Sequence, residues 1–197
     1  AGVTLARFIW ASPIALLYLY ALYQWQPVSA PNFSSEFIFY IVAAAIMQIL
    51  ATGLMVMLFK LENYAIGAGL AKCEAPVSAV LSVLFFGTAL TVTGWIGVLI
   101  GTLGVLIMSS ASGWRSLSPK VFCLGMACST AFALTSLWVR EASLSIGLPF
   151  PHSAAWVLFL VITLQTLIIC TYLFFKERDT LRQIFKKSRL VVMTSLA

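Results

Sequence analysis

Long apolar runs, separated by short polar stretches, follow one another along the chain. A transmembrane helix needs about 20 mostly apolar residues to cross about 30 Å of hydrocarbon, and six runs meet this requirement. They cover residues 3–23, 37–59, 64–86, 93–111, 121–139 and 154–175. None shows the strict alternation of a barrel strand, and only helices or closed barrels satisfy their backbone groups in lipid. The pattern therefore predicts an all-α fold, a polytopic bundle of transmembrane helices.

The composition excludes a soluble domain. Charged residues make up 9% of the 197 residues and hydrophobic residues 61%, whereas soluble domains carry about 25% charged residues. The apolar content is also too high for a disordered chain. The first run is too long for a signal peptide and lacks a cleavage boundary. The chain opens with Ala1 and closes with an apolar stretch, 190–197, too short to span, so we expect an interior piece of a larger membrane protein.

The basic residues predict an orientation. The net charge is +6, and six of the twelve Lys and Arg residues fall within 176–189. Alternation of the loops places this stretch on the same side as most other basic residues, which are Arg7, Lys60, Arg115 and Lys120. The opposite side carries only Arg140, beside Glu141. Basic loops face the cytoplasm and its anionic headgroups, so we expect 176–189 inside, the loop after the first span outside, and no nucleic-acid partner.

Catalytic and metal-binding patterns are missing from the sequence. The four cysteines lie inside apolar runs without CxxC spacing, so we expect buried free thiols rather than a disulfide framework or a zinc site. They are Cys73, Cys123, Cys128 and Cys170. The single histidine, His152, stands beside Pro149 and Pro151 in a loop, where we expect it to be solvated. The sequence predicts no catalytic residue, no metal and no cofactor.

Two charged residues interrupt the third apolar run. Each charge at the bilayer centre costs about 2.5–3.5 kcal/mol, and Lys72 and Glu74, two residues apart on a helix, point in different directions and cannot pair. Pro76 removes a backbone donor nearby, which predicts a kink. The segment is typical of discontinuous helices that line transporter sites. Alternatively, the span begins nearer Ala71 and both side chains snorkel to the interface; the pattern favours neither interpretation.

Small residues on the fourth run, and polar residues on the second and sixth runs, indicate contacts between helices. Four glycines share one face of the fourth run and predict close packing of a neighbouring helix rather than a phosphate loop. They are Gly94, Gly97, Gly101 and Gly104. Gln48 with Thr52, and Gln165 with Thr166, could bind a substrate, although hydrogen bonding between helices is the favoured role.

A set of short motifs extends this picture. The matching positions are Arg7-Phe8, Glu74, Pro76, Thr91, Trp95-Ile96-Gly97 and Gly104-Val105. In the motifs from Glu74 to Val105 the stretch 37–110 resembles EamA-type members of the drug/metabolite transporter superfamily, and Arg7-Phe8 is similar to the Arg-Phe opening of that family's second helix. Glu74 and Pro76 are similar to the family's Glu-Pro segment with one residue inserted, and Thr88 stands where the family's turn has an acidic residue.

The resemblance implies a ten-helix transporter built from two inverted repeats. Residues 1–111 would form the first repeat without its opening helix, 112–120 a linker, and 121–197 the start of the second repeat. The implied function is export of a small polar metabolite, such as an amino acid, by alternating access. The expected location is a bacterial cytoplasmic (inner) membrane. The expected partners are the small-molecule substrate, the lipid bilayer and a second copy of the chain.

The predicted substrate cavity takes its residues from the second, third and fourth runs. The candidates are Lys72, Glu74, Tyr64, Gln48 and Trp95. Glu74 is also a candidate carrier of a coupled proton. A scaffold subunit without transport activity is an alternative, and it would tolerate neutral replacements of Lys72 and Glu74. An intramembrane enzyme is a further alternative that would need clustered His, Asp or Ser at membrane depth.

Overall fold

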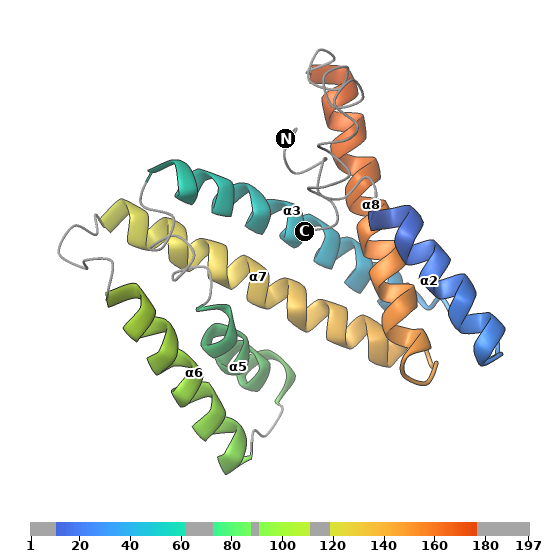
Figure 1. The fold of residues 1–197 in the computed structure, drawn as a ribbon, viewed down its shortest axis with the longest axis horizontal. Helices are drawn as coiled ribbons and strands as arrows, with labels where there is room; N and C mark the ends of the chain where they lie inside the picture. The colour runs from blue at the N-terminus through green and yellow to red at the C-terminus, as the bar shows by residue number, and fades with distance from the viewer. Residues whose placement is uncertain (1–10, 62–72, 88–90, 111–118, 177–197) are drawn as a thin grey trace. The chain divides into compact units, whose positions relative to one another are not determined.

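The structure is a computed structural model, and it describes residues 11–61, 73–87, 91–110 and 119–176 (Figure 1). Within these residues the chain forms six helices and no strand. The helices are α2 (Ala11–Trp25), α3 (Ser35–Leu61), α5 (Glu74–Phe86), α6 (Val92–Ser110), α7 (Pro119–Ser145) and α8 (His152–Lys176). The predicted all-α class is confirmed for this part of the chain.

Three of these helices, α3, α7 and α8, are long and apolar enough to cross a membrane. They contain 27, 27 and 25 residues, which at about 1.5 Å per residue gives about 38–40 Å, more than the hydrocarbon thickness of about 30 Å. The other predicted spans correspond to α2, α5 and α6, which are shorter. Residues 3–10 and 64–72 of those spans lie outside the described residues. The three long helices indicate a multi-pass membrane protein.

The chain divides into two compact units. One unit combines Ala1–Ile46 with Trp138–Ala197, and the other is Met47–Leu137. The boundaries fall inside α3 and α7, so each of these helices contributes to both units. This division follows spatial contacts, whereas the division at 112–120 is implied by the resemblance to EamA-type transporters and stays a prediction.

The core of the first unit brings together the start of α3, the end of α7 and the first half of α8. Its buried residues are Phe37, Ile41, Ala44, Ala45, Ala142, Ile146, Leu148, Val157 and Val161. Ala44, Ala45 and Ala142 are completely buried, and their small side chains let helix backbones approach closely. In the same unit, α2 packs along α8.

The second unit holds the end of α3, the start of α7, and the pair α5 and α6. Leu58 of α3 packs against Val121 of α7, and the Cys128 thiol donates a hydrogen bond to the Ala51 carbonyl oxygen at 3.5 Å. Helices α5 and α6 pack against each other. Gly87 ends α5 with φ of 59°, and its N–H donates to the Val83 carbonyl at 3.2 Å, the conformation for which glycine is preferred at helix ends.

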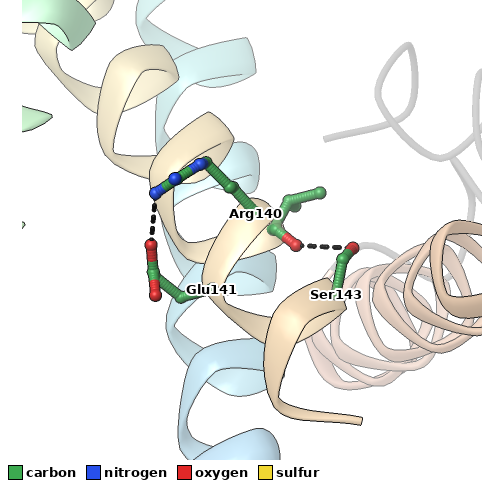
Figure 2. Close-up of polar contacts among 4 residues, drawn as sticks. Arg140, Glu141 and Ser143 are labelled. Atoms are coloured by element: carbon green, nitrogen blue, oxygen red, sulfur yellow. Dashed lines mark hydrogen bonds and ion pairs between the residues drawn. The ribbon is translucent and has the colours of Figure 1, made fainter. Parts of the chain in front are cut away.

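Helix α7 continues past the predicted end of its span at residue 139. Arg140 and Glu141 pair with each other at 2.7 Å, and the Ser143 hydroxyl donates to the Val139 carbonyl at 2.9 Å (Figure 2). The prediction of a loop beginning at Arg140 is wrong for residues 140–145, because these polar side chains find partners within the helix itself. Gly147, with φ of 73°, follows the end of the helix.

Candidate functional site

Glu74 is the first residue of α5, and Cys73 precedes it as the N-cap. The Val77 N–H donates to the Cys73 carbonyl at 3.3 Å. Pro76 therefore lies in the first turn, where backbone N–H groups have no partner within the helix and a proline costs little. Helix α5 begins two residues before Pro76, and residues 62–72 lie outside the described ones, so the predicted kink stays a prediction.

The Glu74 carboxylate contacts α7. The Ser136 hydroxyl donates a hydrogen bond to Glu74 Oε1 at 2.5 Å, within the range of short bonds to ionised oxygens. Ser136 is residue 18 of the 27 in α7. It is four residues from the helix centre, which is about 6 Å along the axis. The hydrogen bond therefore ties Glu74 to the middle of a helix long enough to cross a membrane.

The two residues of this pair differ in exposure within the described part of the chain. Ser136 is exposed and Glu74 is half-buried. The first turn of a helix favours a negative charge, because the N–H groups there carry the positive end of the helix dipole. The position in the first turn and the Ser136 hydroxyl therefore both suit an acidic side chain at residue 74.

Three of the five predicted cavity residues, Glu74, Gln48 and Trp95, lie in the described part of the chain. Tyr64 and Lys72 lie outside the described residues. Gln48 is half-buried on α3, where its backbone carbonyl accepts a hydrogen bond from the Thr52 hydroxyl at 2.8 Å. Trp95 is exposed on α6. In the described part of the chain, no hydrogen bond joins the side chains of Glu74, Gln48 and Trp95, so a common cavity stays a prediction.

The glycine face of α6 has no close neighbour among the described residues. A Cβ atom built on Gly97, Gly101 or Gly104 meets nothing within 4 Å. Gly94 lies at the start of the helix, where its N–H donates to Thr91 Oγ1 at 3.2 Å. Helix packing on this face stays a prediction, because no described part of the chain occupies it.

No family model matches the chain. Neither a curated protein nor a solved structure matches it. The resemblance to EamA-type transporters therefore rests on the sequence motifs alone.

An apolar groove of about 510 Å³ lies in the first unit, between α3 and α8. Its lining residues are Phe33, Phe37, Ile38, Ile41, Val42, Leu160, Thr163, Leu164 and Leu167. Only the threonine carries a polar side chain, so the groove offers a polar metabolite almost no hydrogen bonds. It does not fit the predicted substrate.

Several polar residues lie where the sequence did not place them. Ser136 is 62 residues from Glu74, and no local motif marks it. His152 was expected in solvent but is 1% exposed, because α8 begins at this residue and packs on α2. Gln165 is also 1% exposed, and its Oε1 atom has no hydrogen-bond partner among the described residues.

The cysteines correct a further prediction. Among the described residues none of the four cysteines forms a disulfide, but only Cys128 is buried, and Cys123 is exposed. An apolar run in a membrane helix has outward-facing positions as well as buried ones, so its residues need not be buried. Among the residues that the structure describes, no group of three or more His, Cys, Asp or Glu side chains could hold a metal ion.

Proposed function

We propose that this chain forms part of a multi-pass transporter that exports a small polar metabolite by alternating access across a bacterial inner membrane. The arrangement of ten helices in two inverted repeats belongs to this proposal. The sequence motifs and the three membrane-length helices support it. The observation that carries it is the carboxylate of Glu74, held by Ser136 near the middle of α7.

An unpaired charge is costly at membrane depth. A charge facing lipid tails at the bilayer centre costs about 2.5–3.5 kcal/mol, and such residues instead face a water-filled cavity or other protein groups. Among the described residues Ser136 is exposed and Glu74 is half-buried, and a pair that contains a carboxylate suits a water-filled path better than contact with lipid. In many transporters, helices that begin near the midplane point their N-termini into the substrate site, and α5 begins at Glu74.

The chemistry of the pair indicates what this path accepts. A carboxylate accepts hydrogen bonds or a proton, and its partner hydroxyl fixes the orientation of one oxygen. A metabolite with a donor group, such as the ammonium of an amino acid, is complementary to the remaining oxygen. Glu74 would contact the substrate or a coupled proton, and Ser136 would position the carboxylate.

The test measures transport by the full-length protein in proteoliposomes across a panel of metabolites. Glu74→Gln should lower the transport rate at least about tenfold, the effect of about 1.4 kcal/mol, because it removes the charge but keeps the shape. Ser136→Ala should lower the rate less, since the carboxylate remains. Glu36→Gln is the matched control, because Glu36 is an exposed carboxylate in the first turn of α3, and it should transport at the parental rate.

Two results would contradict the proposal at different levels. If the parent protein transports no member of a broad panel, the transporter assignment is wrong. If the parent transports and Glu74→Gln matches it, with normal membrane insertion, Glu74 lies at the interface and the site is elsewhere.

A further inference from the structure

Polar side chains join α2 and the residue that follows it, Gln26, to α8 at three levels. The contacts are Ser12 Oγ to Thr163 Oγ1 at 2.7 Å, Trp156 Nε1–H to Tyr23 Oη at 3.0 Å, and His152 Nε2 to the Gln26 carbonyl at 2.9 Å. The residue numbers rise along α2 as they fall along α8, so the two helices are antiparallel. Because a carbonyl oxygen only accepts, His152 Nε2 carries the proton and donates it.

The contact is continuous between these levels. Ser12, Ala15, Leu19 and Tyr23 follow one another at helical spacing on a single face of α2, and Ala15 and Leu19 are its buried residues. From Ser12 to Tyr23 this face extends over eleven residues, or about 16 Å. At its end the Tyr23 ring packs edge to face with His152, with ring centroids 5.1 Å apart.

This contact joins the two repeats of the proposed transporter. Helix α2 belongs to the first repeat, 1–111, and α8 to the second, 121–197. If whole repeats rocked against each other, every cycle would separate the hydroxyls, the indole N–H and the imidazole from their partners. In an apolar environment water cannot replace those partners.

We infer that α2 and α8 stay together throughout the transport cycle, so that α2 moves with the second repeat. This inference rests on the proposed function, and it changes which helices form the moving bodies. The assignment of α2 to the moving body of the second repeat depends on contacts at three levels rather than on one hydrogen bond.

A disulfide at the Ser12–Thr163 level tests the inference. Cysteines at these positions place sulfur atoms where oxygens now lie 2.7 Å apart, and a disulfide of about 2.05 Å needs little movement. The double variant Ser12→Cys/Thr163→Cys is made in full-length protein from which Cys73, Cys123, Cys128 and Cys170 have been removed. Oxidation should form the disulfide, seen as loss of thiol labelling, and transport should stay within about twofold of the reduced rate.

A tenfold or greater loss of transport on oxidation, restored by a reductant, would overturn the inference. Failure of the disulfide to form in correctly inserted protein would overturn it as well. The control pair Ser12→Cys/Gln165→Cys should not cross-link, because residue 165 lies about 200° around α8 from residue 163. A parent that transports nothing would overturn the proposed function instead, while the disulfide yield still tests whether α2 and α8 lie together.

Discussion

Gln165 offers a direct test of the energetics of this fold. It is residue 14 of the 25 in α8, its side chain is 1% exposed, and its Oε1 atom has no hydrogen-bond partner in the described part of the chain. A side chain buried inside a helix bundle at membrane depth has no bulk water to satisfy such an atom. Gln165→Met keeps an unbranched side chain of similar length and removes the amide, so we expect the variant to be more stable.

The magnitude follows from two opposing contributions. A buried polar atom without a partner costs about 1–3 kcal/mol. A hydrogen bond from the Gln165 amide nitrogen to another helix would be lost in the variant, and such a bond contributes about 0.6 kcal/mol on average in a membrane. The free energy of unfolding should therefore rise by about 0.4–2.4 kcal/mol. The measurement is SDS-induced unfolding in mixed micelles, followed by circular dichroism at several SDS fractions.

Gln24→Met provides the matched control for this substitution. Gln24 is exposed on α2, where its Nε2 atom donates to the Tyr20 hydroxyl at 3.0 Å. An exposed substitution of this kind usually changes stability by no more than about 0.5 kcal/mol. If Gln165→Met lowers the free energy of unfolding by about 1 kcal/mol or more, Oε1 has a donor partner and the reasoning is refuted.

Two further predictions concern the α2–α8 contact and the orientation of the chain. Tyr23→Phe and Trp156→Phe should show a coupling free energy of about 0.5–1.7 kcal/mol in a double-mutant cycle of unfolding. Either single variant already loses the hydrogen bond of 3.0 Å between the two side chains. If the effects of the two substitutions are additive, this bond does not contribute to stability. The orientation is tested in intact cells with protein from which the native cysteines have been removed. Cysteines introduced within 176–189 should be shielded from an impermeant thiol reagent, whereas a cysteine in place of Asn32 should be labelled. The opposite labelling pattern would reverse the orientation.

The membrane helices could be predicted because the length of an apolar run is a property of the sequence alone. The runs 37–59, 121–139 and 154–175 each lie within one long helix, α3, α7 and α8. The end of α7 could not be predicted in this way. Arg140 ends an apolar run without ending a helix, since a helix continues wherever its polar side chains are solvated or paired, as Arg140 and Glu141 are.

The candidate site was predictable only in part. The cost of burying a charge singled out Glu74, but nothing singled out Ser136 as its partner. Hydroxyls in membrane helices commonly bond their own backbone, as Thr135 does to the Ala131 carbonyl at 2.9 Å, so the sequence cannot tell which of them reaches another helix. Flanking prolines suggested that His152 was exposed, whereas the tertiary contact with α2 buries it.

The length of α3 has a consequence for the lipids around it. Glu36 lies in its first turn and Lys60 in its last, and the 24 residues from one to the other extend about 36 Å. Both charged groups favour the headgroup region, so in hydrocarbon about 30 Å thick the helix would tilt by about 34° to match it. Thicker bilayers would bring α3 upright. Because α3 supplies Phe37 to one core and Leu58 to the other, acyl-chain length would act on both cores through this one helix.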